Sequence, residues 1–117
     1  MSKKVLLIEN DGNKQLLHSK TDILRIYGNE VVSTGYLEEA EKLLGSGTYS
    51  TVVYFMEPRT EKSVEFIPTI RKEQPQAKIL VCCSSMYLKD YEKQIMAANL
   101  VPVKIPALMR DISSQVI

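Results

Sequence analysis

The alternation of two kinds of segment constrains the fold of this chain more than any other feature of its sequence. Short apolar runs alternate with longer segments in which apolar residues recur at helical spacing. The short runs are residues 5–8, 31–32, 51–56, 79–83 and 100–103, and the helical patterns are residues 16–27, 37–44, 64–70, 88–98 and 107–116. The pattern predicts that a strand is followed by a helix five times in succession. Pro68 predicts a kink or a break in the third helix.

Strands that are separated by helices need crossover connections, and these give a parallel sheet with helices on both faces. We therefore expect an α/β fold, in which a doubly wound parallel sheet of five strands is covered by the helices. The length of 117 residues fits one domain, residues 1–117. Open sheets of this kind place their functional sites at the carboxyl ends of the strands. The residues that follow the strands are therefore the candidates for function.

Composition excludes several other classes of protein. Hydrophobic residues make up 44% of the chain and charged residues 25%, and the formal net charge is +1. These values are ordinary for a globular domain, and they give no electrostatic footprint for direct binding to nucleic acid or to a membrane surface. The apolar stretch after Lys3 and Lys4 is too short for a signal peptide, so we expect a cytoplasmic protein. Cys82 and Cys83 are adjacent, which fits neither a disulfide framework nor a metal site.

Polar residues follow the strands at the expected edge. Glu9, Asn10 and Asp11 come at the end of the first strand, where two carboxylates and an amide could hold a hard cation such as Mg²⁺. The same residues could instead form a turn and cap the first helix. Ser84 and Lys104 follow the fourth and fifth strands, and the lysine could meet an anion or pair with the acidic residues.

At these positions the chain resembles the receiver domain of bacterial two-component response regulators. The resemblance covers nearly the whole chain and depends on several short segments in the right order. These are residues 4–11, residues 27–31 followed by residues 39–44, residues 56–58, residues 70–75, and Lys104 followed by Pro106. It implies a flavodoxin-like (βα)5 fold. In that family an aspartate at the end of the third strand accepts a phosphoryl group from a histidine kinase, while an acidic pair holds Mg²⁺.

The sequence departs from this family at the acceptor. Counting back from Pro58 puts the acceptor position at Tyr54, whereas counting forward from Tyr49 puts it at Phe55. Neither residue is a carboxylate, and a phenol is mostly neutral at pH 7. The resemblance therefore indicates a degenerate receiver, or pseudo-receiver, that has no catalytic residue and is not an enzyme. We expect whichever aromatic faces the pocket to fill it.

The other positions of the family's site are altered as well. The acidic pair has become Glu9 and Asn10, so we expect Mg²⁺ binding to be weak or absent and no cofactor to be needed. The position that contacts the phosphoryl group falls on Cys83 or Ser84, and Lys104 is separated from its proline by Ile105. Glu57 is the remaining acid of the third loop. It is either a solvated loop residue or a partner of Lys104.

The resulting hypothesis is an atypical receiver domain that acts in phosphorelay signalling by protein–protein contact, without aspartate phosphorylation. The resemblance implies a histidine kinase or an effector as partner, bound through the fourth helix, the fifth strand and the fifth helix, or a homodimer. Two alternatives stay open. One is a receiver that uses a non-standard acid, Glu9, Asp11 or Glu57, as acceptor, and the other is the regulatory domain of a longer DNA-binding response regulator. A flavin or nucleotide binder is disfavoured, because Gly12 follows acidic residues that repel phosphate.

Overall fold

The computed structural model describes residues 4–10, 14–106 and 109–116. Strands and helices alternate along the chain, as the sequence pattern predicts. The strands are β1 (Lys4–Glu9), β2 (Glu30–Thr34), β3 (Thr51–Phe55), β4 (Lys78–Ser84) and β5 (Val101–Ile105). The helices are α1 (Lys14–Ile26), α2 (Leu37–Ser46), α3 (Glu61–Glu73), α4 (Ser85–Ala97) and α5 (Met109–Ser113).

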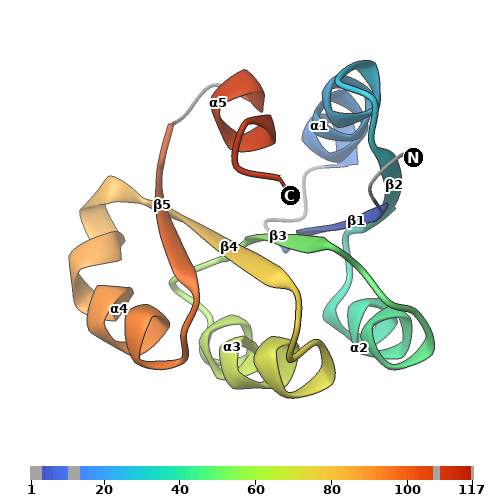
Figure 1. Ribbon diagram of the computed structural model, residues 1–117. Coiled ribbons are helices and arrows are strands. Elements are labelled where there is room, and N and C mark those ends of the chain that lie inside the picture. Colours follow the sequence, from blue (N-terminus) through green and yellow to red (C-terminus); the bar gives the residue numbers. More distant parts are fainter. Residues whose placement is uncertain (1–3, 11–13, 107–108, 117) are drawn as a thin grey trace.

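The strands form one parallel sheet of five strands in the order β2-β1-β3-β4-β5. Helices α1 and α5 cover one face of this sheet, and α2, α3 and α4 cover the other (Figure 1). The predicted (βα)5 doubly wound fold is confirmed. No helix in the described part of the chain is long and apolar enough to cross a membrane.

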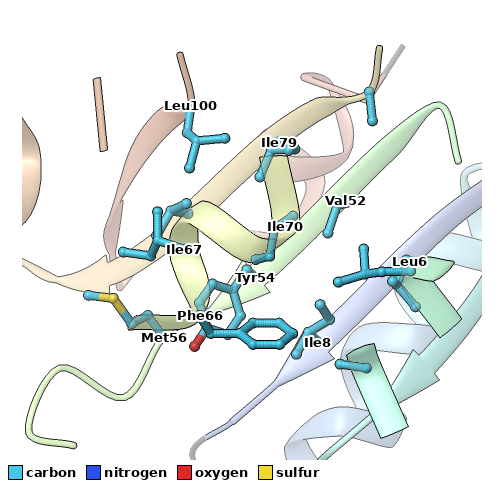
Figure 2. Packing of buried hydrophobic residues seen from close by; sticks show 14 of the residues in the cluster. Leu6, Ile8, Val52, Tyr54, Met56, Phe66, Ile67, Ile70, Ile79 and Leu100 are labelled. Atoms are coloured by element: carbon cyan, nitrogen blue, oxygen red, sulfur yellow. The ribbon is translucent and has the colours of Figure 1, made fainter. Parts of the chain in front are cut away.

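Each face of the sheet has its own hydrophobic core, because successive residues of a strand point to opposite faces. The core under α2, α3 and α4 contains Leu6 and Ile8 of β1 and Val52 and Tyr54 of β3 (Figure 2). The core under α1 and α5 contains the alternate residues of the same strands, such as Leu7, Val53 and Phe55. Strands β1, β3 and β4 are buried on both faces, which is why they read as continuous apolar runs.

Two sequence predictions need correction. Of the kink or break predicted at Pro68, the break does not occur: α3 continues from Glu61 to Glu73 with Pro68 exposed inside it. The fifth strand begins and ends later than predicted, so that Lys104 and Ile105 lie within β5. This second difference changes where the side chain of Lys104 points.

Candidate functional site

The carboxyl ends of β1, β3 and β4 bring the predicted site residues to one edge of the sheet. Glu9, the last residue of β1, is in register with Phe55, the last residue of β3. Phe55 is in turn in register with Cys82 of β4. The backbone N–H of Asn10 donates a hydrogen bond of 3.1 Å to the carbonyl of Phe55. This edge is the candidate site that the alternating pattern predicts.

Tyr54 and Phe55 are both buried, but they lie on opposite faces of the sheet. Tyr54 points into the core beneath α3, where its ring meets that of Phe66 edge to face at a centroid distance of 5.7 Å (Figure 2). Its hydroxyl lies 2.6 Å from both the carbonyl oxygen and the Oγ of Ser63. Burial raises the pKa of the Tyr54 phenol far above its usual value, and the Ser63 hydrogen bond lowers it slightly. Tyr54 is therefore a neutral core residue.

Phe55 points to the face that α1 and α5 cover, and a cation lies over its ring. The Nζ of Lys20, from α1, is 3.5 Å from the ring centroid. The same ammonium group forms a salt bridge with the carboxylate of Glu9. The Glu9 side chain is 1% exposed and that of Lys20 is 16% exposed, so the pair is almost entirely removed from water. Carboxylate, ammonium and aromatic ring thus form one compact group, which we call the Glu9–Lys20–Phe55 cluster.

Sequence reasoning missed Lys20, although the sequence carries a signal for it. Leu17, Thr21 and Leu24 lie on the inward side of α1, and Lys20 stands between them at the same helical spacing. A lysine on the inward stripe of a helix must find a partner for its charge or extend to solvent. In this chain it finds Glu9.

Cys82 and Cys83 are both buried free thiols, and burial is the main influence on their pKa values. Burial raises the pKa of the Cys82 thiol to about 12, while the nearby Lys20 lowers it and Glu9 raises it. Cys83 is buried on the opposite face, and burial also raises its pKa. Ser84 is partly exposed and directly precedes α4, but its side chain makes no capping hydrogen bond. Neither thiol is therefore activated as a nucleophile.

Lys104 does not join the cluster. It is in register with Cys83 and exposed, and with Leu88 and Pro102 it lines a groove of about 410 Å³ between α4 and β5. Its neighbour Ile105 points to the α1 and α5 face and packs against the core that contains Phe55. Successive side chains of a strand point to opposite faces of the sheet. The one residue between Lys104 and Pro106 is therefore enough to put Lys104 on the α4 face and Ile105 on the α1 and α5 face.

The remaining predicted residues lie around the edge of the site. Glu57 accepts hydrogen bonds from Arg59, at 2.8 Å from Nε and 3.1 Å from Nη2, and this guanidinium lowers the pKa of Glu57. Glu57 therefore pairs with Arg59, as a loop residue, and not with Lys104. Asn10 lines a groove of about 720 Å³ together with Tyr36 and Lys62, among others. Asp11 lies outside the described residues.

The described residues do not fit a divalent cation at this edge. Among residues 4–10, 14–106 and 109–116, no three His, Cys, Asp or Glu side chains gather where they could hold a metal ion. Mg²⁺ binds through carboxylates and water, and the Glu9 carboxylate already faces an ammonium group. Asn10 supplies only a neutral amide. The third strand ends at Phe55, whose ring offers no oxygen ligand.

No protein-family model matches the chain, and no curated protein matches it significantly in sequence. Solved structures do match it over nearly its full length. A response regulator receiver domain protein from Methanospirillum hungatei is 19% identical with a TM-score of 0.83, covering 98% of this chain and 90% of its own. A response regulator of Burkholderia pseudomallei that carries a phosphorylated aspartic acid, a calcium ion and citrate is 20% identical with a TM-score of 0.81, covering 99% and 67%.

A third similar structure is described as an adenylate cyclase from Rhodopirellula baltica. It is 18% identical with a TM-score of 0.84, covering 99% of this chain and 85% of its own. At these identities the comparisons show the fold, which is that of CheY-like receiver domains. A shared fold does not by itself fix the function, so the function has to be argued from the site.

Proposed function

We propose that this chain is an atypical receiver domain that takes part in two-component signalling by binding other proteins, without phosphorylation of an aspartate. The receiver fold over 98% to 99% of the chain supports the first half of this proposal. The chemistry at the end of β3 supports the second half.

The observation that carries the proposal is the position of Phe55. It is the last residue of β3, it lies beside Glu9 in the sheet register, and its ring faces the Glu9 carboxylate across Lys20. We assign the acceptor position to Phe55 on these grounds, since Tyr54 points into the opposite core. A phenyl ring carries no nucleophilic oxygen, so no acyl phosphate forms there.

The residues of β5 that would respond to a phosphoryl group at the end of β3 also point in other directions. Lys104 points away from Phe55, and Ile105 takes the face that Phe55 shares. An apolar residue cannot stabilise the charge of a phosphoryl group. We therefore propose that the domain holds a single conformation in which its binding surface is permanently displayed.

The proposed partner surface comprises α4, β5 and α5. Met86 at the start of α4 is 71% exposed, and the groove between α4 and β5 has Leu88 and Pro102 among its lining residues. Lys89, Glu92 and Lys104 flank these apolar residues. An apolar floor with a charged rim suits a protein partner. A histidine kinase or an effector is the proposed occupant, and a second copy of this chain is the alternative.

Two further possibilities are weaker. A non-standard acidic acceptor has poor candidates among the described residues, because Glu9 is paired with Lys20 and Glu57 with Arg59. A role as the regulatory part of a longer DNA-binding response regulator is compatible with the same binding surface, since the partner would then belong to the same chain.

The test is incubation with acetyl phosphate and Mg²⁺, followed by intact-mass measurement, with an aspartate-containing receiver domain as positive control. We expect no added phosphoryl group on this chain under conditions that phosphorylate the control. A mass increase that hydroxylamine removes would mark an acyl phosphate and overturn the proposal, and fragmentation would then show which acid accepts it.

A further inference from the structure

The Glu9–Lys20–Phe55 cluster places a positive charge inside the edge of the sheet. The Glu9 side chain is 1% exposed, and a buried carboxylate is strongly destabilising unless a positive charge or several donors face it. In this chain the positive charge comes from the protein itself. Lys20 reaches it from the inward stripe of α1, next to Leu17 and Thr21.

The ammonium group is held from two sides. The Glu9 carboxylate binds it, and the face of the Phe55 ring lies 3.5 Å away, within the range of a strong cation–π contact. Phe55 is in register with Cys82 of β4, so the ammonium group over the Phe55 ring lies at the end of the central strands of the sheet. Only 16% of the side chain is exposed, so water and salt screen this charge little.

A divalent cation and this ammonium group would need the same carboxylate. The structure assigns to Lys20 the role of a resident counter-ion, which neutralises Glu9 and closes the end of the sheet to divalent cations. The inference rests on the proposed function in treating this edge as a site that no longer accepts phosphoryl groups. It goes further by naming the residue that keeps the edge closed.

The first experiment compares the removal of one charge of the pair with the removal of both. Lys20→Met keeps the stem of the side chain and removes the positive charge that faces the buried Glu9 carboxylate. We expect the Tm to fall by roughly 10 to 20 °C. Glu9→Gln combined with Lys20→Met removes both charges and should recover most of that loss, and it remains measurable even if the single variant fails to fold. Equal Tm values for Lys20→Met and the wild type would overturn the inference.

The second experiment asks whether a metal ion can replace the ammonium group. Lys20→Ala removes the ammonium group that competes for Glu9 and leaves this carboxylate, the Asn10 amide and water as weak ligands, and we expect millimolar Mn²⁺ to raise the Tm of this variant by a small but measurable amount. The wild type and the Glu9→Gln/Lys20→Ala double variant should not respond. Failure of Mn²⁺ to stabilise Lys20→Ala, or an equal response of the wild type, would show that Lys20 does not stand in for a cation.

A third measurement uses the unmodified chain. A group above the centre of an aromatic ring has its NMR signals moved upfield, so the Nζ and Cε protons of Lys20 should be shifted strongly. Lys4 provides the matched control, because its Nζ is 5.2 Å from the centroid of the Tyr49 ring and should be shifted less. Phe55→Leu should abolish the Lys20 shift and leave that of Lys4 unchanged. Unshifted Lys20 signals would mean that the cluster does not form in solution.

The two proposals fail in different ways. Phosphorylation of the wild type would overturn the proposed function, whatever Lys20 does. A wild type that is not phosphorylated, combined with a Lys20→Ala variant that ignores Mn²⁺, would leave the proposed function in place and overturn only the role of Lys20.

Discussion

Tyr54 and Phe55 are neighbours in the sequence, yet they belong to two regions with different physical chemistry. Tyr54 lies in the core beneath α3, where Phe66 packs against its ring and Ser63 satisfies its hydroxyl. Phe55 lies on the other face at the edge of the sheet, where its ring contacts the ammonium group of Lys20. One aromatic residue is surrounded by apolar neighbours, and the other covers a charge pair.

The comparison distinguishes a region that stabilises the fold from a region at the candidate functional site. In the core around Tyr54 the apolar side chains pack against one another, and the Tyr54 hydroxyl is hydrogen-bonded to Ser63. The Glu9–Lys20–Phe55 cluster places a carboxylate and an ammonium group at the position where this fold carries its sites, and it binds them to each other. Substitutions at Tyr54 should therefore act on folding, whereas those in the cluster should also change what the edge of the sheet can bind.

The largest expected effect is that of Tyr54→Ala. Removing a fully buried ring leaves a cavity and takes away the hydroxyl that bonds to Ser63, whose Oγ keeps only the hydrogen bond that it accepts from the backbone N–H of Glu57. The free energy of unfolding should therefore fall by roughly 4–5 kcal/mol. Phe55→Ala should lower the free energy of unfolding by about 3 kcal/mol, because the flexible Lys20 side chain and solvent can partly fill the space that the ring leaves. Urea unfolding of both variants tests the order. A greater loss for Phe55→Ala would contradict the distinction between the two regions.

The next effect is a loss of stability at alkaline pH. Burial raises the pKa of Tyr54 in the folded state, while the phenol of the unfolded chain titrates near ~10. The contribution of Tyr54 is therefore complete below pH ~10 and is lost above it, at up to ~1.4 kcal/mol per pH unit. Burial of Cys82, whose pKa is raised to about 12, acts in the same direction from a slightly lower pH.

Urea unfolding between pH 8 and 11 measures this dependence. Tyr54→Phe should flatten the slope above pH ~10 at a cost of about 1–2 kcal/mol near neutrality, because it removes the hydroxyl that Ser63 binds. Tyr91→Phe is the control for loss of a tyrosine hydroxyl, since this hydroxyl donates to the carbonyl of Pro58. An unchanged slope in Tyr54→Phe would show that the phenol does not stay protonated in the folded state.

The smallest expected effect is that of removing a surface ion pair, in contrast to the buried pair of Glu9 and Lys20. Arg59 is 72% exposed and pairs with Glu57 in the loop after β3. Exposed pairs of this kind contribute little, so Arg59→Ala should leave the midpoint of urea unfolding nearly unchanged. The contrast with Lys20→Met sharpens the comparison. A loss as large as that of Lys20→Met would mean that the exposed pair of Glu57 and Arg59 stabilises this edge as much as the buried pair does.

The sequence was sufficient to predict the fold, because strands buried on both faces and amphipathic helices carry distinct periodicities. It also placed Glu9 and Phe55 at the same edge. It could not decide between Tyr54 and Phe55, since a shift of one residue exchanges the faces of a strand. Lys104 was ambiguous for the same reason, because its direction depends on β5 extending to Ile105.

Lys20 was missed for a different reason. A lysine on a helix is ordinarily a solvated residue, and only its contact with Glu9, which is distant in the sequence, reveals another role. Its place on the inward stripe of α1 was the available signal. Contacts between charged residues far apart in the sequence follow from the packing of α1 on the sheet, which periodicity alone does not specify.

The central claim is that the edge of the sheet at Phe55 is closed to metal ions and phosphoryl groups. The most direct test is a titration of the ¹⁵N-labelled chain with Mg²⁺ and beryllofluoride, an analogue of the phosphoryl group, followed through the backbone amide signals. We predict that the signals of Glu9, Asn10 and Phe55 stay in place at millimolar concentrations. Saturable shifts confined to these residues and Cys83 would show an open, functioning site and contradict the account.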